Sequence, residues 1–240
     1  MAAAELRSED IVLEIGAGIG NLTKRLSEKA IKVIAIELDP ILVNVLHDQF
    51  DDIKNIDIIA GDALTIDFPK FDKVISNLPY SISSEITFKL LHHKFKLGIL
   101  MYQYEFAARM VSKPNCKDYS RLTINTYYFS DASILMEVPK EAFHPVPDVH
   151  SAVVKIVPRS TPFEVRDEVF FMKFVAAVFS QRRKKIRNAI MNTNYILKIP
   201  SIRDLIAQLP TNLINRRAEN LTPEQLAEVA NLIVDLRSKS

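Results

Sequence analysis

The first half of the chain alternates short apolar runs with segments of helical periodicity. Short apolar runs are typical of buried parallel strands, whereas apolar positions three and four apart indicate a helix with one buried face. Strands are predicted at residues 11–15, 32–36, 57–60, 73–76 and 97–101. Helices are predicted from Asn21 to about Ala30, from Asp39-Pro40 with Leu42, Val45 and Leu46 on one face, and from Ser83 to His92. This alternation predicts a parallel sheet with right-handed crossovers.

The pattern changes in the second half of the chain. Segments 122–129, 132–138 and 151–157 are strand-like, which favours an antiparallel edge on the parallel sheet. After Pro158, apolar residues fall at helical spacing: Phe170, Phe171, Phe174, Val175, Val178 and Phe179. The run Thr222-Pro223-Glu224-Gln225 has the capping signature of a last helix, with Leu226, Val229 and Ile233 facing inward. The sequence therefore predicts a Rossmann-like α/β domain over residues 1–158 and a small all-helical domain over residues 159–240.

Charge is divided unevenly between these two domains, although the net charge is only +2. Residues 159–240 carry 14 Lys and Arg against 8 Asp and Glu, a net charge of +6, so residues 1–158 are at −4. A positive helical domain suits a polyanionic partner, and the alternative is an ordinary solvated helix surface. Cys116 is a lone cysteine, which excludes an internal disulfide and fits a reducing cytoplasm. We expect no signal peptide, no membrane span and no metal site, because the chain has neither a long apolar run nor ligand-spaced histidines.

Three of the five glycines lie in Glu14-Ile15-Gly16-Ala17-Gly18-Ile19-Gly20, between the first predicted strand and the first helix. Glycines there let the backbone turn sharply and let a ligand approach main-chain atoms. Glu37 ends the second strand and can accept hydrogen bonds from both hydroxyls of a ribose. Asp62, in Gly61-Asp62-Ala63 after the third strand, can accept one from an adenine amine. These positions meet at the carboxyl edge of the sheet, where open α/β sheets bind ligands.

The spacing of these residues indicates which nucleoside is bound. A dinucleotide fingerprint needs a third glycine where this chain has Asn21. The order Gly-x-Gly-x-Gly, led by an acid and followed by acids after the next two strands, is typical of S-adenosylmethionine sites. A tight turn with helix-capping acids would explain each residue singly, but not the series. The predicted cofactor residues are Glu14, Gly16, Gly18, Glu37, Leu38, Asp62, Ala63 and Asn77.

Asn77-Leu78-Pro79-Tyr80 follows the fourth predicted strand at the same edge. The N6 amine of adenine is a poor nucleophile because its lone pair is conjugated into the ring. An enzyme can make this nitrogen more nucleophilic by accepting hydrogen bonds from its N–H groups. The Asn77 side-chain oxygen and a carbonyl near Leu78 can do so, while Pro79 stiffens the loop and Tyr80 offers a ring for stacking. No strong general base is needed, because the product ammonium loses its proton readily to water. The alternative is a common turn with a core tyrosine.

Two further motifs carry candidate chemistry. Phe143-His144-Pro145-Val146-Pro147 is stiffened by two prolines, and Phe143 can form the second wall of a base sandwich; otherwise it is a proline-rich connector. Residues 179–188 are predicted to be helical and pack five cations into six positions. Such a cluster suits RNA phosphates, and binding through it should weaken with salt. The predicted RNA-binding residues are Arg182, Arg183, Lys184, Lys185 and Arg187.

Together these motifs resemble the small-subunit rRNA adenine N6,N6-dimethyltransferases (the KsgA type), and most closely their archaeal and eukaryotic branch. The resemblance covers nearly the whole chain and includes the run from Leu100 to Met110 and Phe179-Ser180-Gln181-Arg182-Arg183. It implies that S-adenosylmethionine donates two methyl groups to each of two adjacent adenines near the 3′ end of small-subunit rRNA. It also implies a role in ribosome biogenesis on the pre-small ribosomal subunit, and residues matching Asn77, Tyr80 and Phe143 around the target adenine. We expect a cytoplasmic monomer.

The chain departs from this family at several positions. Family members begin with a basic arm and a helix, whereas about ten residues precede Ile11 here, so we expect that arm to be absent. Ser120 replaces the usual glycine of Tyr-Gly-Arg-Leu, and Ser81 and Glu85 replace the Gln and Pro that commonly follow Asn-Leu-Pro-Tyr. We expect these changes to tune the acceptor loop.

Two other functions fit part of the pattern. A large-subunit rRNA methyltransferase of the macrolide-resistance type shares the cofactor and acceptor motifs. An RNA-binding assembly factor with weak activity would share the fold. The motif from Gln103 to Met110 and the basic cluster favour the small-subunit enzyme.

Overall fold

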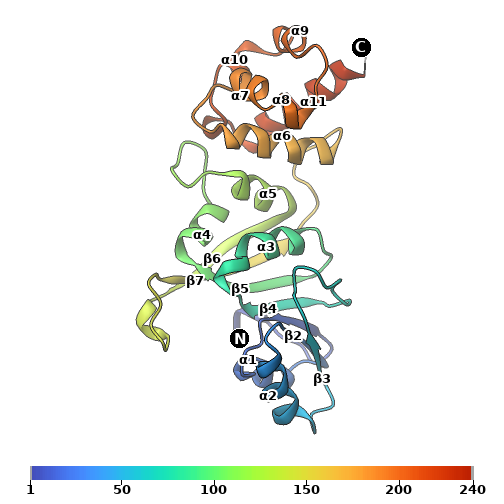
Figure 1. The fold of residues 1–240 in the computed structure, drawn as a ribbon, viewed down its shortest axis with the longest axis vertical. Helices are drawn as coiled ribbons and strands as arrows, with labels where there is room; N and C mark the ends of the chain where they lie inside the picture. Colours follow the sequence, from blue (N-terminus) through green and yellow to red (C-terminus); the bar gives the residue numbers. More distant parts are fainter. Residues whose placement is uncertain (1, 239–240) are drawn as a thin grey trace. The chain divides into compact units, whose positions relative to one another are not determined.

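Seven strands form one sheet in the order β3-β2-β1-β4-β5-β7-β6 (Figure 1). The computed structural model describes residues 2–238. The strands are β1 Ile11–Ile15, β2 Lys32–Glu37, β3 Ile56–Ala60, β4 Lys73–Asn77, β5 Leu97–Gln103, β6 Ser130–Val138 and β7 Ser151–Pro158. Strands β1 to β5 are parallel, and β7 and β6 add an antiparallel edge. The predicted mostly parallel sheet with an antiparallel edge is therefore confirmed.

The sheet reverses its winding direction between β1 and β4. The chain proceeds outward from β1 through β2 to β3, and then returns to place β4 on the other side of β1. Ligands of open α/β sheets bind at this switch point, outside the carboxyl ends of the strands. The loops that follow β1 and β4 therefore flank the expected site.

The helices around the sheet correct several details of the prediction. They are η1 Ala2–Ala4, α1 Asn21–Ser27, α2 Pro40–Phe50, η2 Tyr80–Ile82, α3 Ser83–Leu91, α4 Tyr104–Met110 and η3 Lys140–Ala142. Helix α1 is capped by Gly20 in a left-handed conformation, not by Asn21, and ends at Ser27. Helix α2 begins at Asp39-Pro40 as predicted, but it buries Val43, Leu46 and Phe50, and Val45 is exposed. The face was misassigned because apolar residues occur on more than one side of this short helix.

Residues 122–129 were predicted as a strand, and this is wrong: they lie in helix α5, Arg121–Phe129. The segment buries Leu122, Thr123, Ile124, Asn125, Thr126 and Tyr128, so side chains are covered nearly all round and no helical stripe is visible in the sequence. The hydroxyl of Thr123 accepts a hydrogen bond from the Ser120 N–H at 3.0 Å and donates to the Arg109 carbonyl at 2.6 Å. These contacts fix the start of the helix and override the β propensity of its residues.

The chain divides into two compact units. One holds the sheet, with residues up to Ala108 and Phe129–Arg159, and the other holds Arg109–Tyr128 and the chain from Ser160 onward. The predicted boundary at residue 158 lies beside this second junction, but the prediction had placed Arg109–Tyr128 with the sheet. That segment packs in the helical unit, because the Tyr119 hydroxyl donates to the Leu221 carbonyl at 2.8 Å and its ring meets Phe179 edge-on.

The helical unit follows the predicted apolar pattern after Ser160. Its elements are α6 Glu168–Ser180, α7 Ile186–Asn192, α8 Asn194–Leu197, α9 Ile202–Ala207, α10 Thr211–Ile214, η4 Ala218–Asn220 and α11 Pro223–Arg237. The predicted capping box is present, since the Thr222 and Gln225 side chains each accept from the other residue's backbone N–H. No helix within residues 2–238 is long and apolar enough to cross a bilayer.

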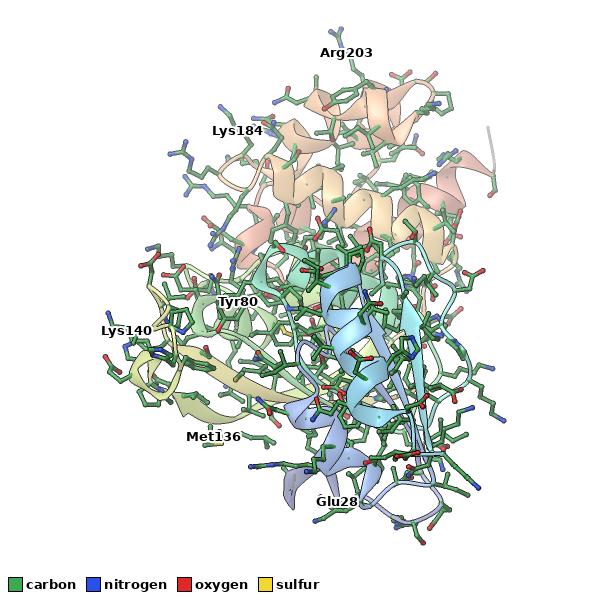
Figure 2. The ribbon with its side chains drawn as sticks, turned by 60° about the horizontal axis from the view of Figure 1, so that its bottom comes forward. Glu28, Tyr80, Met136, Lys140, Lys184 and Arg203 are labelled. Atoms are coloured by element: carbon green, nitrogen blue, oxygen red, sulfur yellow. The ribbon has the colours of Figure 1, made fainter. Side chains whose placement is uncertain are left out.

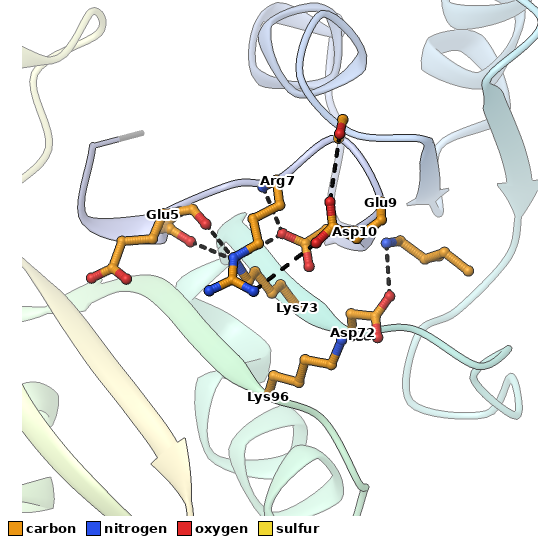
Figure 3. Close-up of polar contacts among 10 residues, drawn as sticks. Glu5, Arg7, Glu9, Asp10, Asp72, Lys73 and Lys96 are labelled. Carbon is orange, nitrogen blue, oxygen red and sulfur yellow. Dashed lines mark hydrogen bonds and ion pairs between the residues drawn. The ribbon is translucent and has the colours of Figure 1, made fainter.

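A buried ion pair ties the start of the chain to the sheet (Figure 3). The Lys73 ammonium, at the start of β4, lies 2.8 Å from an Asp10 carboxylate oxygen, with the two side chains 8% and 2% exposed. It also donates to the carbonyls of Ala4 at 3.0 Å and Glu5 at 2.6 Å. All three ammonium donors are therefore used, and the segment before β1 is held against the amino edge of the sheet.

Replacing this cation should destabilise the protein strongly. Lys73→Met leaves Asp10 buried without its partner, so we expect the free energy of unfolding to fall by about 3 kcal/mol. Lys96→Met is the matched control, because Lys96 lies at a similar 2.9 Å from Asp72 but is 65% exposed. Solvent screens that pair, so its loss should have a much smaller effect. Denaturant unfolding measures both changes, and equal losses would contradict the role assigned to burial.

The stability contributed by the Asp10–Lys73 ion pair should depend on pH. Burial opposes ionisation of Asp10, but hydrogen bonds from Lys73 and the Arg7 N–H, together with the Lys73 charge, outweigh it and hold the pKa of Asp10 below its usual 3.8. The stability that this carboxylate contributes is therefore complete above pH 3.8 and is lost as the pH falls through its lowered pKa. In Lys73→Met the hydrogen bond and charge that lower this pKa are absent and burial prevails, so the acid-dependent loss should disappear. Denaturant unfolding of both proteins as a function of pH measures this difference, and the same acid-dependent loss in the variant would contradict it.

Candidate functional site

The glycine loop after β1 presents bare backbone at the carboxyl edge of the sheet. Gly16 and Gly18 have φ angles of +73° and +60°, in the left-handed region that favours glycine. The Gly16 N–H donates to the Ile36 carbonyl at 2.8 Å, so the loop is fixed to the end of β2. A Cβ placed on Gly18 would meet nothing within 4 Å. Open space therefore lies beside main-chain atoms, as a ligand that packs on the backbone requires.

Glu37, the last residue of β2, joins the glycine loop to the start of the next segment. Its carboxylate accepts from the Gly18 N–H at 2.8 Å, from the Leu38 N–H at 2.8 Å and from the Asp39 N–H at 3.0 Å. A carboxylate has about four acceptor positions, so these bonds leave one on the oxygen that faces Gly18. In this arrangement Glu37 can accept from one ribose hydroxyl, rather than from the two expected from the sequence.

Glu14 lies beneath the loop instead of lining the open edge. It is 2% exposed and accepts a hydrogen bond from the Thr23 hydroxyl at 2.6 Å. Burial raises the pKa of Glu14 to about 7; the Thr23 hydrogen bond opposes this shift, and the negative charge of Glu37 adds to it. Glu14 therefore supports the loop from inside the unit and carries only part of a negative charge at neutral pH.

Asp62 lies next to Glu37 across the sheet edge, because the Gly61 N–H donates to the Glu37 carbonyl at 2.8 Å. One carboxylate oxygen accepts from the Leu64 N–H at 2.9 Å, and within residues 2–238 the other receives no hydrogen bond. The Leu38 and Ile19 side chains of the neighbouring loops are exposed. A free carboxylate oxygen, exposed apolar side chains and bare backbone together fit an adenosine group. The buried Ala63 contributes its carbonyl to Lys89 at 2.8 Å, which braces the Asp62 turn.

The two motifs predicted to bind the target adenine, residues 77–80 and 143–147, line one pocket of about 290 Å³. It is lined by Asn77, Leu78, Pro79, Tyr80, Phe143, His144, Pro145 and Pro147. Asn77 ends β4 and is exposed, while Leu78 is buried and anchors the loop. Phe143 comes from the segment between β6 and β7, which projects from the sheet in Figure 1, and Figure 2 shows Tyr80 on the same side as Lys140 of that segment. Residues separated by more than 60 positions therefore share one hollow.

The acceptor loop touches the glycine loop directly. A Cβ on Gly16 would lie 3.1 Å from the Cγ and Cδ atoms of Pro79, so the two loops are already in close contact. Ser76 reinforces this junction: its hydroxyl accepts from the Ile15 N–H at 3.3 Å and donates to the Ile15 carbonyl. Ser76 was not among the predicted site residues, although it is a polar residue inside the apolar run of β4, which was the available signal.

The basic cluster is not helical, contrary to prediction. Helix α6 ends at Ser180 and α7 begins at Ile186, so only Arg187 of the five cations lies on a helix. Residues 181–185 form a turn because Lys185 bridges to Arg217 and the Ile186 N–H donates to the Arg216 carbonyl at 2.8 Å. These long-range contacts replace the helical hydrogen bonds that the local sequence favours.

The turn borders a hollow of about 650 Å³ in the helical unit. Its lining comprises Lys117, Ser180, Gln181, Arg182, Arg183, Lys184, Arg217 and Glu219, and Figure 2 shows Lys184 extending outward. Arg182 is held in the wall, with Nε 2.9 Å from a Glu219 oxygen and Nη2 donating to the Cys116 carbonyl at 3.0 Å. Within residues 2–238, Arg183, Lys184 and Lys117 form no ion pair. Lys117 and Arg217 are cations that the sequence analysis missed, because they come from distant segments.

The sheet order, the glycine loop and the acids after β2 and β3 define a Rossmann-like methyltransferase of the S-adenosylmethionine-dependent class. No group of three or more His, Cys, Asp or Glu within residues 2–238 is arranged to hold a metal ion. Residues 1–234 match the family described as ribosomal RNA adenine dimethylase. The chain therefore belongs to that family of enzymes, whose methyl donor is S-adenosylmethionine, and the family resemblance seen in the sequence is confirmed.

Individual relatives agree with this assignment. The chain is 72% identical to the probable ribosomal RNA small subunit methyltransferase A of Methanosarcina barkeri, over 99% of this chain and 83% of that protein. It is 44% identical to the protein of the same description from Natronomonas pharaonis, over 95% and 84%. A crystal structure of a dimethyladenosine transferase from Plasmodium falciparum matches with a TM-score of 0.80 at 31% identity, over 99% and 94%. The crystal structure of the 23S rRNA methyltransferase ErmE gives 0.68 at 25% identity, over 97% and 94%.

Two glycine substitutions should distinguish the effect of backbone strain from the effect of a steric contact with Pro79 in the loop after β4. Gly16→Ala and Gly18→Ala both place a side chain at positive φ, which costs about 1–2 kcal/mol of stability. Only the Gly16 methyl group pushes against Pro79. We therefore expect similar melting temperatures but a lower kcat for methyl transfer in Gly16→Ala, measured at saturating S-adenosylmethionine. Equal kcat values at equal stability would show that the contact with Pro79 does not affect the acceptor loop.

Proposed function

We propose that the chain transfers methyl groups to the N6 amines of two adjacent adenines near the 3′ end of small-subunit rRNA, giving N6,N6-dimethyladenosine during ribosome biogenesis. The observation that carries this proposal is the pocket in which Asn77 and Tyr80 meet Phe143, with Pro79 in contact with the glycine loop. An acceptor pocket beside a nucleoside site is the arrangement that methyl transfer requires. The small-subunit description of relatives at 72% identity supports the choice of RNA.

The pocket residues have different roles in binding an adenine. The Asn77 side-chain oxygen and the Leu78 carbonyl accept hydrogen bonds from the amine, which raises the electron density on nitrogen. Tyr80 and Phe143 hold the extruded base between two rings, as base-modifying enzymes do. The proton leaves the product to water, so no side chain in the pocket has to act as a strong base.

The groups that would bind the methyl donor, S-adenosylmethionine, lie at the ends of three strands. Glu37 would accept from a ribose hydroxyl of S-adenosylmethionine and Asp62 from its adenine amine, while the Gly16 and Gly18 backbone and the exposed Leu38 side chain would pack against it. When bound, S-adenosylmethionine supplies an electrophilic methyl group on sulfur.

The helical unit contributes the cations for RNA backbone contacts. Residues 181–184 of the turn line a hollow together with Lys117 and Arg217, and the lining includes a single carboxylate, that of Glu219. Phosphate groups are attracted to such a site, and the excess of cations in this part of the chain extends that field. The enzyme would act in the cytoplasm, where it meets assembling small subunits.

The two alternatives are less well supported. ErmE acts on 23S rRNA by its description, and it is less similar to this chain than the dimethyladenosine transferase in both TM-score and identity. An RNA-binding assembly factor with weak activity would have little need of a pocket in contact with the glycine loop.

Methyl transfer to unmodified small subunits tests the proposal. The wild-type chain with S-adenosylmethionine labelled in the methyl group should label N6,N6-dimethyladenosine at two adjacent positions of the small-subunit rRNA. Label in large-subunit rRNA would favour the first alternative, and tight particle binding without label the second.

In Tyr80→Ala, loss of stacking worth ~1–3 kcal/mol should lower turnover by roughly 10- to 100-fold, while cofactor affinity persists. Unchanged turnover would remove Tyr80 from the acceptor site.

Neutralising the basic turn should change the salt dependence of RNA binding. In Arg183→Ala/Lys184→Ala, the slope of log affinity against log salt should fall by roughly 0.7–0.9 for each RNA phosphate that the variant no longer neutralises. Arg182→Ala should mainly lower the melting temperature, because Arg182 braces Glu219 and the Cys116 carbonyl. Arg25→Ala/Lys29→Ala, at two exposed positions of the sheet unit, removes the same two charges and is the matched control. A slope unchanged from wild type in the double variant would exclude this turn as the RNA surface.

A further inference from the structure

We infer that Ser151 is a positioning residue, whose buried hydroxyl holds the ring of Tyr80 in the orientation that the target adenine requires. This inference rests on the proposed function and deepens it. Ser151 belongs to neither the cofactor motif nor the acceptor motif, and it does not line the acceptor pocket. It acts on the substrate only through Tyr80.

The contact is a short hydrogen bond between two side chains. The Tyr80 and Ser151 hydroxyl oxygens lie 2.6 Å apart, although 71 positions separate the two residues in sequence. Ser151 is fully buried, whereas the Tyr80 ring is half-buried and borders the pocket. A buried hydroxyl must find a partner, so this bond satisfies Ser151 and at the same time selects the position of the ring tip.

Ser151 is a rigid anchor because strands hold it on both sides. It is the first residue of β7, and it pairs with Gln103 on β5 and with Val138 on β6. One residue earlier, the His150 carbonyl accepts from the Tyr104 N–H at 2.9 Å. The hydroxyl of Ser151 therefore has little freedom to move relative to the sheet.

Tyr80 is held at both of its ends. Its backbone lies in the single turn η2, where the Ser83 N–H donates to the Tyr80 carbonyl and the Ile82 N–H donates to the Pro79 carbonyl at 3.2 Å. Its hydroxyl is held by Ser151. With the Cα and the ring tip both fixed, rotation of the side chain is restricted, and the face of the ring stays available to the pocket.

The same anchor also ends the other segment that lines the pocket. The segment that carries Phe143, Pro145 and Pro147 leads into β7 at Ser151. Ser151 therefore lies where this segment joins the sheet and also bonds the tip of Tyr80. A binding site prepared in this way spends less interaction energy on ordering its side chains when the base enters.

The experiment compares Tyr80→Phe, Ser151→Ala and the double variant in the labelled-methyl assay on unmodified small subunits. Tyr80→Phe keeps the ring and removes only the hydroxyl, so it tests the inference even where Ser151→Ala folds poorly. We expect each single change to lower kcat about tenfold, with the affinity for S-adenosylmethionine unchanged, because the donor side is not involved. The double variant should be no slower than either single variant, since all three lack the same bond.

Two further variants separate positioning from general stability. Ser151→Thr retains the hydroxyl and should recover most of the kcat that Ser151→Ala loses. Ser133→Ala removes an exposed hydroxyl on the neighbouring strand β6 and should leave kcat at the wild-type level. Melting temperatures of all variants show whether a loss of kcat follows unfolding.

The outcomes distinguish this inference from the proposed function. A wild-type chain that transfers no methyl group to adenine would remove the proposed function, and the inference with it. An active wild type whose Tyr80→Phe variant keeps full kcat would overturn the inference alone. Additive losses in the double variant would do the same, because they would mean that the two hydroxyls act independently.

Discussion

The contact between the loops that follow β1 and β4 is the constraint on which the site depends. These strands are neighbours, yet 57 residues lie between Ile15 and Lys73 in the chain, and the sheet reverses its winding direction between them. Gly16 has no side chain and therefore allows Pro79 to lie against it, while Ser76 joins the two strand ends by hydrogen bonds. Under the proposed function, a donor on the first loop and an acceptor on the second would therefore be neighbours.

The acids around this contact play different physical roles. Glu37 is committed largely to backbone N–H groups and keeps about one acceptor position for a ligand, whereas Asp62 keeps a whole oxygen. Glu14 is buried with its pKa raised to about 7, so it supports the loop and carries only part of a negative charge at neutral pH. Three acids at the spacing typical of a cofactor site therefore do not make three equivalent ligands. Burial and backbone hydrogen bonding decide which of them can bind.

The helical unit shows a similar distinction between a cation held by other residues and a cation open to solvent. Arg182 and Arg183 are adjacent in sequence and identical in type, but Arg182 is bonded into the wall of the hollow and Arg183 is exposed. Lys117 and Arg217 reach the same hollow from other segments, while Arg187 and Lys185 do not line it. The proposed RNA surface is therefore assembled by the fold, and only part of it can be recognised as a run of basic residues in the sequence.

The sequence by itself determined the parallel sheet, the glycine loop, the acids after β2 and β3 and the motif from Asn77 to Tyr80, because each depends on local periodicity and spacing. It also indicated the helical domain through the apolar spacing of Phe171, Phe174 and Val178. Only the tertiary structure decided that residues 122–129 form a helix, that residues 181–185 form a turn, and that Ser151 bonds Tyr80. The physical reason is that burial on all sides, a β-bridge and a hydrogen bond across 71 positions are long-range interactions. These interactions outweigh local preferences for helix or strand of roughly a few tenths of a kcal/mol per residue. They do not appear as a periodic pattern of residues in the sequence.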